Sequence, residues 1–176
     1  MTGENGDLWV FGYGSLMWRP GFDFVERHQA RLIGLHRSLC VYSHYHRGTP
    51  ERPGLVLGLD RGGACRGIAF RVEEAKREAT IAYLREREQV TSVYVEVERM
   101  VTLAVPGEPR VRALTYIIDR GHAQYAGRLS PEEQLHFIRS GHGHSGPNPE
   151  YVRNTVAAIE EFGFRDAGLH WLASRL

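Results

Sequence analysis

The pattern of hydrophobic and polar positions changes from segment to segment along the chain, and this pattern distinguishes predicted strands from predicted helices. Short runs rich in β-favouring apolar residues and bounded by turn residues predict strands. Such runs cover residues 9–11, 31–42, 55–60, 65–72, 93–97 and 110–118. The Gly62-Gly63 pair predicts a hairpin turn between the third and the fourth run.

Apolar residues at helical spacing predict four helices. The first covers residues 73–89 and places Ile81, Leu84 and Glu88 on one face. The second covers residues 130–139, which open with the serine, proline and glutamate of a capping box.

Asn148 is expected to cap the third helix, and Leu169 and Leu172 belong to the short fourth helix. The third helix has an apolar stripe made of Val152, Val156, Ile159 and Phe162. Strands in meanders, with helices between and after them and no linker, predict one α+β domain over residues 1–176. The polar residues 1–7 are expected to be a loose tail.

The composition is that of an ordinary globular protein. The 176 residues suffice for a core that needs no disulfide or metal. A net charge of +1 argues against a nucleic-acid-binding surface, and no apolar run is long enough to span a membrane. Cys40 and Cys65 have no metal or redox spacing, so we expect reduced thiols in a cytoplasmic protein. The sequence leaves the oligomeric state open.

The first predicted strand runs directly into Gly12-Tyr13-Gly14-Ser15, a loop with two glycines. Glycine lets the backbone turn sharply and approach a ligand closely. Successive backbone N–H groups in such a loop can form a nest for a carboxylate or phosphate. A strand followed by a plain tight turn is the alternative. The loop lacks the third glycine of a dinucleotide-binding fingerprint and the Gly-Lys-Ser/Thr of a P-loop.

Histidines and serines in two other loops could carry different chemistry. The histidines form two His-x-His pairs, His44 with His46 and His142 with His144. Imidazole is a common metal ligand, but no cysteine or carboxylate stands nearby at a ligand spacing, so we expect no metal site. Ser15 and Ser145 could act as nucleophiles, although neither lies in the Gly-x-Ser-x-Gly elbow of α/β-hydrolases.

Glu88 differs from the charged residues around it. It shares a helix face with Leu84 and lies near the end of its predicted helix. Burial and the negative end of the helix dipole both raise the pKa of a carboxyl group. A carboxyl group with a raised pKa is a better general base near neutral pH. The alternative is a solvated surface glutamate, which is the commoner role.

Two motifs stand out when the chain is read as a whole. They are Val10-Phe11-Gly12-Tyr13-Gly14-Ser15-Leu16 with Trp18, and Tyr83-Leu84-Arg85-Glu86-Arg87-Glu88. Further motifs are His46-Arg47-Gly48-Thr49-Pro50, Gly67-Ile68-Ala69-Phe70-Arg71, Tyr125-Ala126-Gly127 and residues 143–151. Over most of its length the chain thus resembles the ChaC-type γ-glutamylcyclotransferases, which degrade glutathione.

The resemblance implies a small mixed β-barrel with flanking helices. It implies an enzyme that cleaves glutathione to 5-oxoproline and cysteinylglycine by intramolecular aminolysis, with Glu88 as general base and acid and without a cofactor. The implied substrate-binding residues are Val10, Phe11, Gly12, Tyr13, Gly14, Ser15, Leu16, Tyr125 and Tyr151. The two tyrosines at 125 and 151 suit structural roles equally well. The implied partner is a small molecule, glutathione or a related γ-glutamyl compound.

Other functions stay open. Residues 89–92 have no glycine where the family has glycines, so a cyclotransferase for other γ-glutamyl amines or amino acids is one alternative. A non-catalytic small-molecule binding domain on the same fold is a second. A metal- or serine-dependent hydrolase built on the histidine loops is a third.

Overall fold

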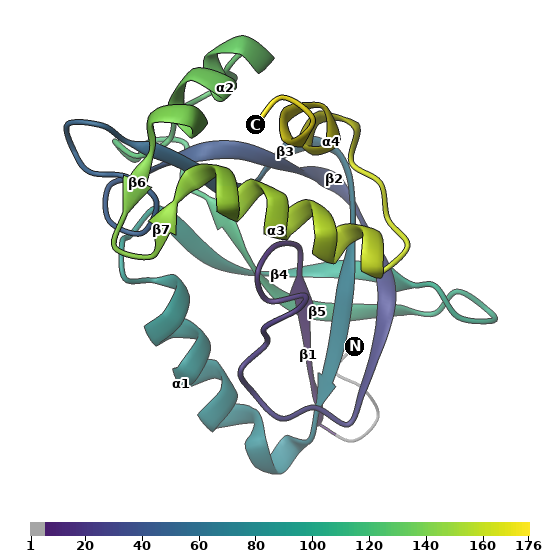
Figure 1. The fold of residues 1–176 in the computed structure, drawn as a ribbon. Coiled ribbons are helices and arrows are strands. Elements are labelled where there is room, and N and C mark those ends of the chain that lie inside the picture. Colours follow the sequence, from purple (N-terminus) through teal and green to yellow (C-terminus); the bar gives the residue numbers. More distant parts are fainter. Residues whose placement is uncertain (1–5) are drawn as a thin grey trace. The chain divides into compact units, whose positions relative to one another are not determined.

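A computed structural model describes residues 6–176 (Figure 1). Its closed barrel consists of β1 (Leu8–Gly12), β2 (Glu26–Ser43), β3 (Gly54–Val72), β4 (Tyr94–Leu103) and β5 (Arg110–Ile118). Neighbouring strands follow the order β1-β3-β2-β4-β5. The barrel is mixed, because β1 pairs in parallel with β5 and antiparallel with β3.

The described residues also contain four α-helices, as the sequence predicts. They are α1 (Arg77–Glu88), α2 (Pro131–Ser140), α3 (Asn148–Glu161) and α4 (Ala167–Ala173). A short 3₁₀ turn, Glu74–Lys76, precedes α1. The capping box of α2 is present, because Ser130 Oγ accepts from Glu133 N and the Glu133 carboxylate accepts from Ser130 N. The predicted fold, an α+β barrel with flanking helices, is therefore confirmed.

The predicted hairpin at Gly62-Gly63 is wrong, because β3 is one continuous strand. Gly62 and Gly63 have φ values of 100° and 67°, and Gly34 in β2 has a φ of 94°. Such left-handed glycines let a long strand bend without ending it. A turn and a bend need the same backbone freedom, so the residue types alone do not separate them.

The predicted helix cap at Asn148 is also wrong. Its side chain caps no N–H of α3 and is completely buried. It pairs instead with the backbone of Leu55, whose N donates to Oδ1 (2.8 Å) and whose O accepts from Nδ2 (2.9 Å). The Asn148 amide therefore makes the two backbone hydrogen bonds that a neighbouring strand would otherwise make to Leu55. It links the beginning of β3 to the beginning of α3.

The chain divides into two compact units, each made of two segments. The first unit is Met1–Arg37 with Leu59–Asp119, and the second is Ser38–Gly58 with Arg120–Leu176. The chain passes between them inside β2 and β3. The single domain expected over residues 1–176 stays a prediction.

The expected loose tail covers residues 1–7, of which residues 1–5 lie outside the described part of the chain. Asp7 itself is held in place by two hydrogen bonds. Its carboxylate accepts from Arg71 Nη1 (2.6 Å) and from Glu74 N (3.0 Å). Asp7, the last residue of the expected tail, is therefore fixed to β3 and to the 3₁₀ turn before α1.

One apolar cluster in the first unit fixes the loop after β1 against α1. Its buried members are Leu8, Val10, Leu16, Val72, Leu84, Leu114 and Tyr116. Leu16 comes from the loop, Leu84 from α1 and Tyr116 from β5. Burial of a large apolar side chain stabilises the fold by about 1.5–3 kcal/mol. This packing therefore holds the loop beside the helix that carries Glu88.

Candidate active site

The loop after β1 turns back on itself within a few residues. Met17 N donates to Gly14 O (2.9 Å), and Arg19 N donates to Ser15 O (2.8 Å). Within residues 6–176 the backbone N–H groups of Gly14, Ser15 and Leu16 have no protein acceptor, although Gly14 and Leu16 are buried. Buried N–H groups are nearly always paired. Three neighbouring unpaired donors therefore indicate a place for the oxygen of a ligand.

Most side chains around this loop are turned into the protein. Val10 and Phe11 are completely buried, and Tyr13 and Leu16 are also core residues. Ser15 is half-buried. The loop therefore offers a ligand its backbone and the Ser15 hydroxyl, rather than a wall of apolar side chains. Contact of this segment with a substrate stays a prediction.

Glu88 is the last residue of α1 and lies on its buried face. Leu84, one turn earlier, is completely buried, and the Glu88 side chain is 18% exposed. Burial raises the pKa of the Glu88 carboxyl, and Arg87, with Nε 3.4 Å from Glu88 Oε1, opposes this rise only in part. The upward shift that the helix pattern predicts is therefore present. Such a carboxyl group accepts a proton more readily than an exposed glutamate.

Tyr116 on β5 belongs to a polar network, centred on Glu96 of β4, that the sequence does not reveal. Its hydroxyl donates to Glu96 Oε2 (3.0 Å), and Arg85 donates from Nε and Nη2 to the two oxygens of Glu96 (2.9 Å each). Burial, then Glu96, then Glu88 raise the pKa of Tyr116. The phenol is therefore neutral at physiological pH and lies close enough to Glu88 to be affected by its charge.

Tyr125 and Tyr151 belong to the second unit. The guanidinium of Arg120 lies over the Tyr125 ring, 5.7 Å from its centroid. The Tyr151 hydroxyl accepts from Leu57 N (3.0 Å), and the Arg47 guanidinium lies 5.7 Å from the Tyr151 ring centroid. These contacts give both tyrosines structural roles, and their contact with a substrate stays a prediction.

One histidine from each His-x-His pair enters a cluster in the second unit. His46 Nδ1 is 2.8 Å from Ser145 Oγ, and the His144 ring stacks on Tyr45 with centroids 4.9 Å apart. The hairpin of β6 (His142–Gly143) and β7 (Gly146–Pro147) carries His144 and Ser145. Its turn is fastened by hydrogen bonds from His144 N to Tyr45 O (2.7 Å) and from Ser145 N to His46 O (2.9 Å). These contacts therefore hold the turn between β6 and β7 against the loop that carries Tyr45 and His46.

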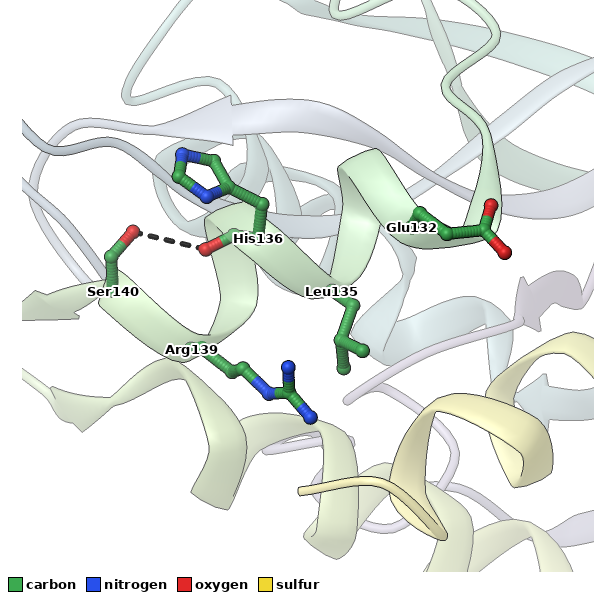
Figure 2. A pocket seen from close by; sticks show the side chains of 5 residues that line it. All are labelled: Glu132, Leu135, His136, Arg139 and Ser140. Carbon is green, nitrogen blue, oxygen red and sulfur yellow. Dashed lines mark hydrogen bonds between the residues drawn. The ribbon is translucent and has the colours of Figure 1, made fainter.

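An open pocket lies along α2 in the second unit. It is lined by Glu132, Leu135, His136, Arg139 and Ser140. Figure 2 shows that the Glu132, His136 and Arg139 side chains point away from one another. The pocket therefore lacks a set of polar groups aimed at one ligand atom. In the part of the chain described, no group of three His, Cys, Asp or Glu side chains could hold a metal ion.

Comparisons with known sequences point to one family. The chain matches the model of the family described as ChaC-like protein over residues 8–175. It is 32% identical over 167 residues to the glutathione-specific γ-glutamylcyclotransferase of Escherichia coli (strain K12), covering 95% of this chain and 71% of that protein. It is 33% identical to γ-glutamylcyclotransferase 2-3 of Arabidopsis thaliana, over 96% of this chain and 88% of that one.

The fold has a solved counterpart. A crystal structure of the yeast γ-glutamyl cyclotransferase specific to glutathione superposes with a TM-score of 0.87 at 23% identity, covering 97% of this chain and 95% of that one. At this identity the likeness shows the fold. Because the family model spans almost all described residues and relatives above 30% identity cover most of the chain, the protein belongs to the ChaC-like family.

Proposed function

We propose that this protein is a γ-glutamylcyclotransferase that acts on glutathione. Relatives in Escherichia coli and Danio rerio carry the name glutathione-specific γ-glutamylcyclotransferase. The observation that carries the proposal is the combination, in one unit, of a carboxyl group with a raised pKa and a loop with three unpaired backbone N–H groups. A proton acceptor and an oxyanion-binding loop are what intramolecular acyl transfer requires.

The first half of the reaction forms the ring. Glu88 takes a proton from the α-ammonium group of the γ-glutamyl moiety, and the resulting amine attacks the γ-carbonyl carbon. A new C–N bond closes a five-membered ring, while the carbonyl oxygen becomes an oxyanion. The N–H groups of Gly14, Ser15 and Leu16 stabilise this oxyanion, and one such donor typically contributes about 2.7–4 kcal/mol.

The second half releases the products. The ring nitrogen, which is positively charged after the attack, releases its surplus proton to solvent. The oxyanion then reforms its carbonyl bond, the C–N bond to cysteinylglycine breaks, and the leaving nitrogen takes the proton that Glu88 holds. The products are 5-oxoproline and cysteinylglycine, and Glu88 returns to its carboxylate form. One carboxyl group therefore takes the proton from the ammonium group and also gives a proton to the leaving nitrogen. None of these steps uses a cofactor.

Activity should fall on the acidic side as Glu88 becomes protonated. Burial raises its carboxyl pKa above the ordinary value of 4.5, and only the carboxylate can accept the ammonium proton. We therefore expect kcat to decline about tenfold per pH unit below an apparent pKa that is higher than 4.5. Initial rates of 5-oxoproline formation across the acidic range measure this limb. A limb centred at or below 4.5 contradicts the assignment of the base.

Substrate preference is tested by product analysis. Incubation with glutathione should yield 5-oxoproline and cysteinylglycine in equal amounts by mass spectrometry. We expect kcat/KM for glutathione to exceed that for γ-glutamyl-alanine by at least about tenfold, because a glutathione-specific enzyme makes contacts to the cysteinylglycine moiety that γ-glutamyl-alanine lacks. Equal values support a general γ-glutamyl substrate instead. If neither compound gives 5-oxoproline, the cyclotransferase proposal is wrong and a non-catalytic binding domain fits better.

A cytoplasmic location belongs to the same proposal. Cys40 and Cys65 are both buried, and neither forms a disulfide within residues 6–176, which suits a compartment that keeps thiols reduced. In residues 6–176 there is no helix with the length and apolar composition needed to cross a bilayer.

A serine hydrolase at His46 and Ser145 is the second candidate function. Their side chains lie within hydrogen-bond distance (2.8 Å), and burial, with help from His144 and Arg47, lowers the pKa of His46, so its imidazole is neutral and can accept a proton. Labelling by a fluorophosphonate that disappears in Ser145→Ala would support this candidate. An unlabelled protein whose Ser145→Ala variant still forms 5-oxoproline excludes it.

A further inference from the structure

Arg87, the residue before Glu88, is bonded to the loop after β1. Its Nη1 donates to the carbonyl oxygens of Arg19 (2.6 Å) and Pro20 (3.0 Å), and its Nη2 donates to Ser15 Oγ (3.0 Å). The Arg87 side chain is 20% exposed. Because the guanidinium is planar and its donors have fixed directions, these bonds hold two points of the loop against the last turn of α1.

The bond from Arg87 decides what the Ser15 hydroxyl can do. A hydroxyl group has one hydrogen to donate and two lone pairs that accept. Arg87 occupies one lone pair, and within residues 6–176 the hydroxyl hydrogen of Ser15 has no acceptor. A hydrogen bond from a cation polarises the O–H group and strengthens it as a donor. Ser15 therefore presents a strengthened donor in the same loop as the unpaired N–H groups.

The Arg87 guanidinium also lies close to the carboxylate of Glu88, the proposed general base. Arg87 Nε lies 3.4 Å from Glu88 Oε1. Arg87 Nη1 is also 3.1 Å from the hydroxyl of Tyr83, one turn earlier on α1. The charge of Glu88 also acts on Tyr116 of β5, because it helps to raise the pKa of the Tyr116 hydroxyl. Arg87 is thus the side chain that connects the carboxylate to the loop.

We propose that Arg87 is a positioning residue for cyclisation, which holds the loop so that the Ser15 hydroxyl and the loop N–H groups donate to one substrate oxygen beside Glu88. The inference rests on the proposed function. Arg87 acts through Ser15, Arg19 and Pro20, toward which its terminal nitrogens are directed. Its ion pair with Glu88 affects the charge of the base, but Arg87 itself takes no part in the proton transfers.

The test compares Arg87→Lys and Arg87→Met with Arg77→Met, a control at the first residue of the same helix. Lysine keeps the positive charge but lacks the fork of donors. We expect kcat for glutathione to fall about 10- to 100-fold in both Arg87 variants, because small displacements of positioned groups have effects of this size. The acidic limb of the pH profile should stay in place in Arg87→Lys and move to higher pH in Arg87→Met. Arg77→Met should behave as wild type.

A double-mutant cycle tests whether Arg87 acts through Ser15. Ser15→Ala should lower kcat at least about tenfold in the wild-type background and have little further effect in Arg87→Met, because coupled groups do not give additive losses. Additive losses overturn the proposal. So does an Arg87→Met protein that has a lower melting temperature but wild-type kcat, KM and pH profile.

Amide hydrogen exchange separates this inference from the proposed function, because it needs no substrate. Exchange at the hydrogen-bonded amides of Met17 and Arg19 should be faster in both Arg87 variants than in wild type and unchanged in Arg77→Met. If the wild-type protein forms no 5-oxoproline, the proposed function fails, and the exchange rates still decide whether Arg87 holds the loop. Wild-type exchange in Arg87→Met overturns the positioning role even when the wild-type enzyme is active.

Discussion

Glu88→Gln is expected to lower kcat for 5-oxoproline formation by about a hundred- to ten-thousand-fold, the usual loss when a general base is removed. Glutamine keeps the size and hydrogen-bonding shape of the side chain, but it cannot take the ammonium proton or return it to the leaving nitrogen. The loop that binds the substrate is unchanged, so KM should change much less than kcat. Steady-state rates with glutathione, followed by 5-oxoproline release, measure both constants.

Glu86→Gln is the matched control, because Glu86 lies on the same last turn of α1 but is exposed. It should retain wild-type kcat and KM, since exposed charges away from a site have small effects. Normal turnover by Glu88→Gln, or an equal loss in Glu86→Gln, would place the base elsewhere.

Stability provides a second readout for Glu88→Gln. Burial raises the folded-state pKa of Glu88 above its unfolded value, so the folded state holds this proton more tightly than the unfolded state. The ionised carboxylate therefore destabilises the fold at pH values above the folded pKa. Glutamine removes that penalty, and the variant should unfold at the same or a higher urea concentration than wild type at neutral pH. The difference should shrink as the pH falls and Glu88 becomes protonated in both states.

The main parts of the candidate site follow from local sequence pattern. A helix places residues four apart on one face, so the buried Leu84 fixes the side on which Glu88 lies. The loop after β1 is recognisable because a buried apolar strand runs straight into glycines. Both features depend on residues close together in the chain, for which spacing is a direct guide to geometry.

Sequence pattern does not predict features that depend on residues far apart in the chain. Alternating valines predict β4, but Val95 is 40% exposed, whereas the carboxylate of Glu96 is bonded to Arg85 and Tyr116. Which face of a strand is buried depends on the elements that pack against that face. The spacing of apolar residues within the strand does not identify those elements. The same applies to Asn148, whose partner Leu55 is 93 residues away.

Gly12→Ala is expected to reduce kcat/KM for glutathione by roughly a hundredfold, although it adds only one methyl group. A Cβ at this buried end of β1 would lie 2.9 Å from Leu16 Cβ and 3.3 Å from Met17 N. Leu16 packs in the apolar cluster that contains Leu84, so it cannot move aside freely. The turn of the loop must shift instead, and the N–H groups of Gly14 and Ser15 move with it.

The fold should tolerate this change better than catalysis does. Overpacking typically costs about 1–3 kcal/mol, and each 1 kcal/mol lowers the melting temperature of a chain this size by about 2–4 °C. Gly168→Ala on α4 is the control, because a Cβ there would lie 3.5 Å from Asp166 Oδ1, an ordinary contact. It should keep wild-type kcat/KM. A folded Gly12→Ala protein with wild-type kcat/KM would show that the reaction does not depend on the position of the loop's N–H groups, because the added methyl group cannot fit unless that loop moves.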